Sequence, residues 1–475
     1  MAVDYGCKPR AGGNQDMVRG RVSRVRRRAG LASRGGMLQV LLLLALLQLA
    51  TSALATPEIE SWVTSKGAKV LFVQADALPM LDVRVVFDAG SARDEGKYGL
   101  AVLTNGLLSE GASGKDAQQI AEDFESVGAQ IEYDALRDTA IIGVRTLTEQ
   151  PYMQSALTSL AEVLTQPDFP QDAFDRERSR MLLSVKARKQ SPAAIAGEAF
   201  NLAVFGDHPY AFPNAGTEES LTGLSRDDVV AFYRRYYVAA NATIAIVGDI
   251  DRTQAEKIVE QLMSGLAKGN PAPALPEVSA LKEAQTVRIE FPSKQTHIYV
   301  GQTGIKRGDD DYLDLYVANH TFGGSGFASR LVEVIREDRG LAYSVYSYFS
   351  PMRQLGAFTM GMQTRNDQAE EALKLLDEQL REYVANGPTA DELDKSVSNI
   401  TGGFPLKFDS NGKLLEYIAM IGFYNLDIHY LDHFIDDVRA VTLDSIKDAL
   451  ERRLHPDRMV VVIVGDGVNG VDKQD

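Results

Sequence analysis

The apolar residues of this 475-residue chain follow the spacing of helices in some stretches and that of strands in others. Residues 83–92 (VRVVFDAGSA) have the dense β-branched pattern of a strand. Residues 116–128 instead place Ile120, Phe124 and Val127 on one helical face and end in a glycine. The same criteria predict further strands at 130–136, 139–147, 297–305, 341–349 and 356–364, and helices at 99–111, 311–324, 328–340, 368–386 and 389–400. Consecutive strands with helices grouped beside them indicate an α+β fold.

The chain also contains an internal repeat. Residues 225–249 match residues 442–466 without a gap, at a constant offset of 217, and both segments end in Ile-Val-Gly-Asp. Each copy starts with an N-cap Ser or Thr, continues as an amphipathic helix and ends in an apolar strand. We therefore expect two duplicated domains, each with a mixed, largely antiparallel sheet packed with helices. A stretch rich in proline and glycine separates them, which predicts four segments: a leader 1–55, an N-terminal domain 56–263, a linker 264–283 and a C-terminal domain 284–475.

The first 55 residues have the features of a secretory signal peptide. An arginine-rich stretch at 21–30 precedes an apolar run at 38–50, and small residues that end at Ala55 suggest a cleavage site. Translation could start at Met1, Met17 or Met37, and an uncleaved membrane anchor is the alternative. If the signal peptide is cleaved, we expect the chain to contact the membrane only transiently, through that peptide during export. The expected location is the periplasm.

Charge and cysteine content narrow the function classes. The chain has a net charge of −15, and residues 1–55 hold nine Lys and Arg against two Asp, so the rest carries −22. Such an acidic body argues against a nucleic-acid partner. The single cysteine, Cys7, lies in the expected leader, which excludes a disulfide or a thiol nucleophile after cleavage.

Four segments together resemble the pitrilysin/insulinase family of zinc peptidases, the inverzincins, in its bacterial two-domain form. They are 85–111 (VVFDAGSARDEGKYGLAVLTNGLLSEG), 205–221 (FGDHPYAFPNAGTEESL), 232–249 (FYRRYYVAANATIAIVGD) and 322–349 (FGGSGFASRLVEVIREDRGLAYSVYSYF). The resemblance covers nearly all of 57–470. It implies the metallopeptidase fold of the LuxS/MPP type for both domains.

The resemblance also locates the metal helix, and there the chain departs from the family. Active members carry H-x-x-E-H on the first helix and a further glutamate ligand on a later helix. The match puts Val102 and Gly106 at the histidine positions, Asn105 at the general base and Ser184 at the last ligand, while Glu177 falls on a supporting carboxylate. A hydrocarbon, a bare backbone carbon and an amide cannot hold zinc or deprotonate its water. No catalytic zinc and no other cofactor is expected in this chain.

The second half keeps an arginine and a tyrosine at the spacing that the family uses to hold substrate over the zinc. These are Arg336 and Tyr343, which would face each other across the turn at Gly340. A guanidinium and a phenol are suitable donors to the oxyanion of a tetrahedral intermediate. The alternative is that Arg336 pairs with Glu333 or Glu337 and that Tyr343 is a half-buried strand residue.

A glycine-rich segment in the second half is a further candidate for substrate binding. Gly323, Gly324, Ser325 and Gly326 resemble the glycine-rich loop of non-catalytic subunits of this family. Glycines let the backbone turn sharply and approach a ligand closely. The alternative is a helix end followed by a new helix start.

The histidines offer one alternative metal site. His429, Asp432 and His433 form H-x-x-D-H, but the family's third ligand, which follows much later, would fall beyond Asp475. His208 is expected in a structural turn. Residues 130–136 are a candidate edge strand for substrate addition.

The resemblance therefore implies a non-catalytic, substrate-binding subunit of an envelope zinc metallopeptidase. A homologous partner subunit would carry H-x-x-E-H and the zinc, and Arg336 and Tyr343 would act on peptides or unfolded protein segments over that zinc. One alternative is a catalytically silent scaffold or peptide-binding protein of the same fold. The other is an active peptidase with a relocated metal site.

Overall fold

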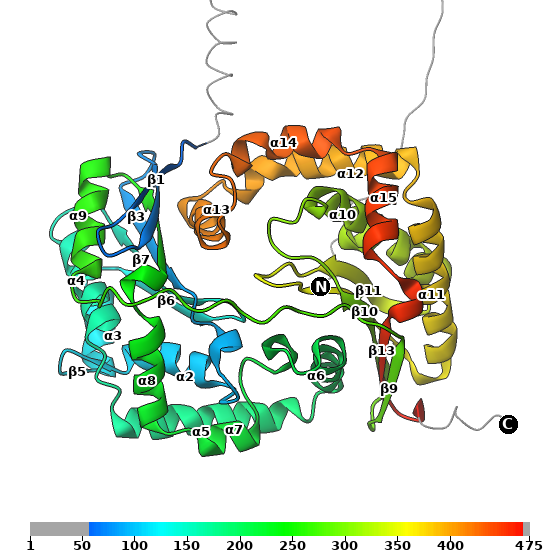
Figure 1. Cartoon of the computed structure of the whole chain (residues 1–475), viewed down its shortest axis with the longest axis horizontal. Helices are drawn as coiled ribbons and strands as arrows, with labels where there is room; N and C mark the ends of the chain where they lie inside the picture. Colours follow the sequence, from blue (N-terminus) through cyan, green and yellow to red (C-terminus); the bar gives the residue numbers. More distant parts are fainter. Residues whose placement is uncertain (1–56, 469–475) are drawn as a thin grey trace, which may run out of the picture. The chain divides into compact units, whose positions relative to one another are not determined.

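The computed structural model describes residues 57–468, and the first half of this range builds a six-stranded sheet (Figure 1). The strand order is β1-β2-β8-β3-β7-β6, antiparallel except for the β2–β8 pair. The strands are β1 (Glu60–Val63), β2 (Lys69–Gln74), β3 (Met80–Phe87), β6 (Gln130–Ala135), β7 (Ala140–Leu147) and β8 (Ala242–Gly248). The expected signal peptide, its cleavage point, its possible start codons and Cys7 lie outside the described residues.

The second half builds a five-stranded sheet in the order β11-β12-β10-β13-β9, with β13 and β9 parallel and the other neighbours antiparallel. Its strands are β9 (Gln285–Glu290), β10 (Gln295–Thr303), β11 (Ala342–Phe349), β12 (Ala357–Arg365) and β13 (Val460–Gly465). A short pair, β4 (Gly111–Ala112) and β5 (Lys115–Asp116), follows the first helix of the first half. The predicted α+β class with largely antiparallel sheets is confirmed.

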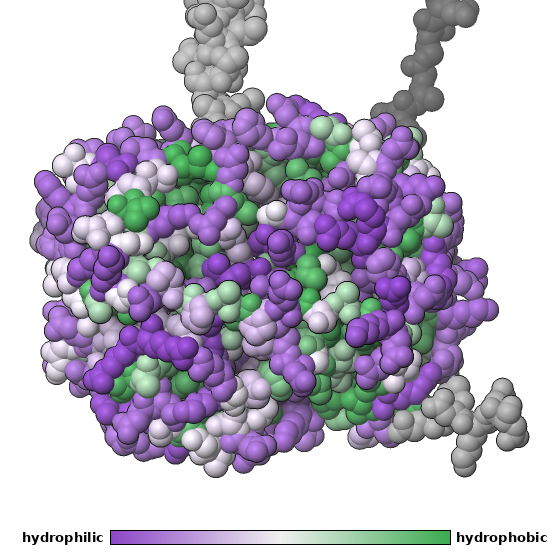
Figure 2. Space-filling view, viewed as in Figure 1, coloured by the Kyte–Doolittle hydropathy of each residue, from purple (hydrophilic) through white to green (hydrophobic). Residues whose placement is uncertain are grey.

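Helices cover the sheets of both halves. In the first half they are α2 (Leu100–Gly106), α3 (Ala117–Glu125), α4 (Tyr152–Thr165), α5 (Gln171–Arg188), α6 (Pro192–Phe205), α7 (Glu218–Gly223), α8 (Arg226–Tyr236) and α9 (Arg252–Met263). In the second half they are α10 (Tyr312–Asn319), α11 (Ala369–Asn386), α12 (Ala390–Gly403), α13 (Asn411–Tyr424), α14 (Tyr430–Ala440) and α15 (Leu443–Arg453). No described helix is both long and apolar enough to cross a bilayer. Figure 2 shows hydrophilic residues over most of the viewed face, with hydrophobic ones in separate patches.

The sequence repeat corresponds to a repeated helix–strand unit. Ser225 caps α8 and Thr442 caps α15, each with a capping box, and the strands β8 and β13 follow. Both strands are almost fully buried because helices or the other half cover both faces of each sheet. The stretch 264–284 between the two sheets has neither helix nor strand.

Each half lends one helix to the sheet of the other half (Figure 1). Helix α6 of the first half packs on β10 and β13, where Phe200 shares a core with Val462. Helix α13 of the second half packs on β8, β3 and β2, where Ile418 shares a core with Leu71 and Val247. The two sheets are therefore held together by apolar side chains from both halves of the chain.

Three helices differ from the continuous α-helices that the sequence predicts. The helix expected at 99–111 is the shorter α2, followed by a 3-10 turn at Leu107–Ser109. Helix α10 ends at Asn319 and continues as a π-helical turn at His320–Gly324, and a second π-helical segment covers Val332–Asp338 within the predicted helix 328–340. Apolar spacing does not distinguish α from π geometry over one or two turns.

Candidate functional site

Helix α2 carries the positions that correspond to the family's metal motif. Asn105, at the general-base position, is only 2 % exposed, and its Nδ2 donates to the backbone oxygen of Ile141 at 3.1 Å and to the hydroxyl of Tyr237 at 3.2 Å. The amide therefore serves as an internal hydrogen-bond donor that ties α2 to β7 and α8. Val102, one turn earlier, is partly buried.

The buried carboxyl of Asp94 anchors the start of α2. Its two oxygens accept hydrogen bonds from the backbone N–H groups of Gly99 and Ala101, both at 2.8 Å. Burial raises the pKa of Asp94 to about 8, and the two backbone hydrogen bonds oppose this rise. Asp94 thus fixes the start of the helix to which the resemblance assigns the metal motif.

The remaining family positions do not complete a metal site. Gly106 has open space where a side chain would stand, and Ser184 is exposed on α5. Glu177 on α5 is buried and paired with Arg180. Zinc needs three or four N, S or O ligands, and within residues 57–468 no three His, Cys, Asp or Glu side chains gather as such a site. These residues do not fit a zinc ion.

The histidines have local roles. The Nδ1 of His429 lies 3.0 Å from the Asp432 carboxylate, and the rings of His429 and His433 are 6.2 Å apart on an exposed stretch of α14. His208 lies in a turn, where Nδ1 accepts from the backbone N–H of Tyr210 at 3.1 Å and Nε2 lies 3.0 Å from the Pro276 oxygen. Burial lowers the pKa of His208.

Arg336 and Tyr343 lie side by side. The guanidinium carbon of Arg336 is 5.3 Å from the ring centroid of Tyr343 and 4.7 Å from that of Phe327. Tyr343 is 79 % exposed and Phe327 is 76 % exposed, so two aromatic rings and one cation form a surface cluster. We call these three residues the Arg–aromatic cluster. The Nε of Arg336 also lies 3.4 Å from the Glu337 carboxylate, as in the alternative interpretation, but Tyr343 is not half-buried.

Phe327 was not expected from the sequence, because an apolar residue next to glycines carries no chemical signal. Its contact with Arg336 depends on the backbone between them. Arg336 lies in the π-helical segment Val332–Asp338. Such segments are rare and are found frequently at functional sites.

The glycine-rich segment joins α10 to this cluster. The π-helical turn His320–Gly324 contains Gly323, where an added Cβ would lie 2.4 Å from the Oγ of Ser347 on β11. Gly326 has a φ of +63°, a conformation that other residues adopt at a cost. Gly324 and Gly326 are exposed and Ser325 is partly exposed. A helix end followed by a new helical turn describes this backbone, and substrate binding by these residues stays a prediction.

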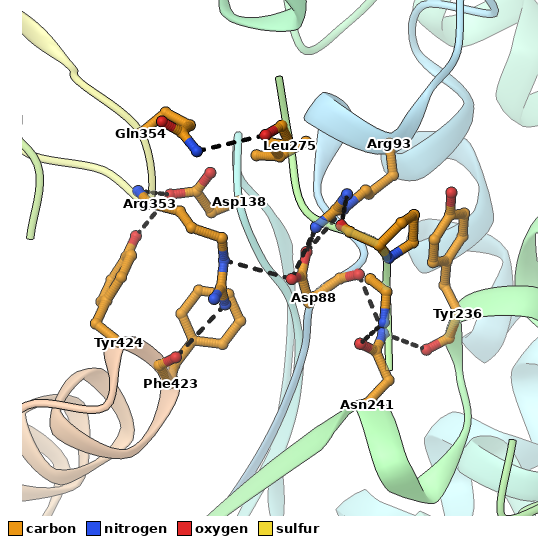
Figure 3. A network of polar contacts seen from close by, with 12 residues as sticks. Asp88, Arg93, Asp138, Tyr236, Asn241, Leu275, Arg353, Gln354, Phe423 and Tyr424 are labelled. Atoms are coloured by element: carbon orange, nitrogen blue, oxygen red, sulfur yellow. Dashed lines mark hydrogen bonds and ion pairs between the residues drawn. The ribbon is translucent and has the colours of Figure 1, made fainter. Parts of the chain in front are cut away.

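A polar network joins the two halves (Figure 3). The Asp138 carboxylate accepts hydrogen bonds from the backbone N–H of Arg353 at 2.8 Å, the Tyr424 hydroxyl at 3.0 Å and the Tyr210 hydroxyl at 2.5 Å. The Arg353 Nε lies 3.3 Å from the Asp88 carboxylate. Burial raises the pKa of Asp88, and the charges of its arginine neighbours oppose this rise.

A polar cleft of about 390 Å³ lies between the first sheet and α13. Arg84 lies in it with its Nη2 2.8 Å from the Glu132 carboxylate and 3.8 Å from that of Glu416 on α13. Glu132 belongs to β6, which is an edge strand of the sheet. Substrate addition to this strand stays a prediction.

Comparisons with known proteins match most of the chain. A family model described as insulinase (peptidase family M16) matches residues 69–218, and one described as peptidase M16 inactive domain matches residues 223–400. A crystal structure titled peptidase M16 inactive domain, from Pseudomonas fluorescens, is 38 % identical with a TM-score of 0.83, and the match covers 86 % of this chain and 98 % of that one.

Two curated relatives bear different names. The uncharacterized zinc protease YmxG of Bacillus subtilis is 25 % identical over 86 % of this chain and 99 % of its own length. The non-peptidase homolog YmxG of Helicobacter pylori is 25 % identical over 90 % of this chain and 97 % of its own length. These matches confirm the resemblance seen in the sequence: the chain belongs to peptidase family M16, the insulinase family.

Proposed function

We propose that this chain is the non-catalytic, substrate-binding subunit of a two-chain zinc peptidase in the bacterial envelope. The supporting observation is a contrast between the halves. The positions that the resemblance assigns to zinc and base hold Val102, Asn105, Gly106 and Ser184. In contrast, Arg336 and Tyr343 are both present and in contact, with Tyr343 exposed and Arg336 partly exposed. The names of an inactive-domain structure and of a non-peptidase homolog are in line with this proposal.

The division of labour follows from the chemistry of peptide hydrolysis. A homologous partner with H-x-x-E-H supplies the zinc that activates water. Arg336 and Tyr343 donate hydrogen bonds to the oxyanion that forms on the scissile carbonyl of a peptide or unfolded segment. Loss of one such donor typically costs roughly 3 kcal/mol of barrier. Tyr343 is exposed and Arg336 is partly exposed, so a second chain can reach both side chains.

Export to the periplasm is part of the proposal. It is supported by the arginine-rich and apolar pattern of residues 1–55 and by the position of the only cysteine, Cys7, within that stretch. Protease added to intact and to lysed spheroplasts tests this part. An exported chain is accessible in both, whereas a cytoplasmic chain is protected until the spheroplasts are lysed.

The experiment for the whole proposal is reconstitution. This chain is purified with and without a homologue that carries H-x-x-E-H, and cleavage of a quenched fluorescent peptide is measured. We expect cleavage that needs both chains and is abolished by EDTA. EDTA-sensitive cleavage by this chain alone would show an active peptidase and contradict the proposal.

A scaffold or peptide-binding protein is the second candidate, and the contact between Arg336 and Glu337 favours it. The double variant Arg336→Ala, Tyr343→Phe separates the two functions. If both side chains bind the oxyanion, the reconstituted pair loses at least about a hundredfold in kcat. Full turnover by the double variant would instead establish the scaffold function.

A further inference from the structure

A pocket of about 300 Å³ lies among α10, α13 and α14 of the second half and shares no lining residue with the Arg–aromatic cluster. Four tyrosines line it, together with the cations Arg307 and Lys407 and the carboxylate of Glu416. We call it the tyrosine pocket. Its volume is at the lower end of the range for small-ligand sites, so it has room for the end of a chain molecule and not for a long segment.

The two cations are not neutralised by carboxylates. Among residues 57–468, the guanidinium of Arg307 makes no hydrogen bond or ion pair, and its Nε is buried. Lys407 donates from Nζ to the hydroxyl of Tyr316 at 3.1 Å and forms no ion pair within the same range. The third charge, Glu416, lies toward Arg84 of the first half, at 3.8 Å. The buried Nε of Arg307 is a costly donor without an acceptor, and Lys407 next to it is exposed. An anionic ligand held by both cations would supply an acceptor and neutralise their charge.

The walls favour an apolar group next to that anion. The ring of Phe434 is 6.2 Å from that of Tyr316 and 5.7 Å from that of Tyr430, which leaves aromatic surface along the pocket. Burial raises the pKa of Tyr417 and Tyr430, so both hydroxyls keep their protons and can donate to an oxygen acceptor. A carboxylate attached to an aromatic or aliphatic group satisfies both the cations and the rings.

The pocket also adjoins the polar cleft beside β6. Glu416 lines both, so the two hollows lie on either side of one side chain. We propose that the tyrosine pocket binds the carboxylate of a peptide through Arg307 and Lys407, with the adjoining side chain against the tyrosine rings. The peptide nature of the ligand rests on the proposed function; the recognition of a carboxylate beside an apolar group does not.

Direct binding to this chain alone tests the proposal. Three fluorescein-labelled hexapeptides of otherwise equal sequence are compared by anisotropy: one ends in phenylalanine with a free carboxylate, one in phenylalanine amide, and one in glutamate amide. We expect the free acid to bind at least about tenfold more tightly than the phenylalanine amide, as for the loss of one charge-assisted contact. Tight binding of the glutamate amide as well would assign a side-chain carboxylate as the ligand and also support the site.

Variants locate the binding. Arg307→Met and Lys407→Met remove each charge and keep the aliphatic stem, and each is expected to abolish the preference for the free acid. Lys374→Met, an exposed lysine paired with Glu378 on α11, is the matched control and keeps the preference. Circular dichroism of each variant establishes that it folds. Equal affinity for all three peptides, or an unchanged preference in both folded pocket variants, would overturn the proposal.

The proposed carboxylate site and the proposed subunit function can fail separately. If the reconstituted pair cleaves peptides but the free acid and the amide bind equally, carboxylate binding by the tyrosine pocket is excluded and the subunit function stands. If the free acid binds through Arg307 but no partner yields cleavage, the pocket stands and the subunit function fails.

Discussion

The guanidinium of Arg353 in the second half lies 3.3 Å from the carboxylate of Asp88 in the first half, and both side chains are largely buried. The variant Arg353→Ala removes one of the positive charges that compensate the buried carboxylate of Asp88. We expect a loss of about 2 kcal/mol in the free energy of unfolding, less than for an isolated buried pair because Arg93 still contacts Asp88. Urea denaturation measures this change.

A surface pair provides the control for that prediction. Arg365→Ala breaks an exposed contact with Asp367, and such pairs contribute little. We expect the same urea midpoint as for the wild type. An Arg353→Ala variant as stable as Arg365→Ala would show that the network does not hold the two halves together.

Asn105 is predicted to serve stability and not catalysis. In Asn105→Ala the Ile141 carbonyl and the Tyr237 hydroxyl lose a buried donor, which is expected to cost about 1–3 kcal/mol. Thermal unfolding checks this, with Gln118→Ala as the control because Gln118 is an exposed partner of Glu122. No destabilisation by Asn105→Ala would contradict the structural role.

The glycines of the second half are predicted to differ in their tolerance of a methyl group. Gly323→Ala places a Cβ 2.4 Å from Ser347 Oγ and is expected to cost about 1–3 kcal/mol by overpacking. Gly402→Ala in α12 meets open space and is expected to stabilise by up to about 1 kcal/mol through helix propensity. Opposite shifts of the melting temperature are the expected result, and equal shifts would rule out the close approach to β11.

Phe327 is predicted to position Arg336 for the partner's substrate. Phe327→Ala removes one of the two rings that hold the guanidinium, and a cation–π contact at an exposed site corresponds to about a two- to fivefold effect. The loss is expected in kcat of the reconstituted pair, with unchanged folding. Leu406→Ala, another exposed apolar residue, is the control. Equal rates for both variants would exclude the positioning role.

Protonation of His320 is predicted to weaken the fold in acid. Its Nδ1 lies 2.9 Å from the Ser396 hydroxyl and its Nε2 3.2 Å from the Asn399 side-chain oxygen, and burial lowers its pKa. The unfolded chain therefore binds this proton at a higher pH than the folded one, so stability falls as the pH drops below about 6.5. Unfolding free energies between pH 7.5 and 5.5 (about two pH units around that value) should fall less steeply for His320→Gln. If the unfolding free energies of the wild type and of His320→Gln changed equally with pH, the predicted role of His320 would be contradicted.

The sequence was sufficient for those features that depend on local pattern. The strands β8 and β13 were recognisable because both lie in apolar runs that repeat at a constant offset, and the capping residues Ser225 and Thr442 marked the helices before them. The positions on α2 could be assigned because the flanking glycine frame is kept. The resemblance therefore assigned the family's ligand positions to residues of this chain, and the side chains at those positions do not fit a zinc ion.

The contacts between the halves could not be predicted in this way. Asp138 is 215 residues from Arg353 and 286 from Tyr424, and none of the three belongs to a local motif. The tyrosine pocket likewise draws its cations from a turn after β10 and from the stretch before α13. Such sites depend on how the elements pack, and packing is not encoded in the spacing of any one segment.

The exchange of α6 and α13 between the sheets makes each half incomplete without the other. A fragment that ends in the stretch 264–284 would carry α6 with no surface to rest on, and its own sheet would expose Leu71 and Val247 to water. Neither half can bury its own sheet alone, so we expect the two halves to unfold together in one cooperative transition.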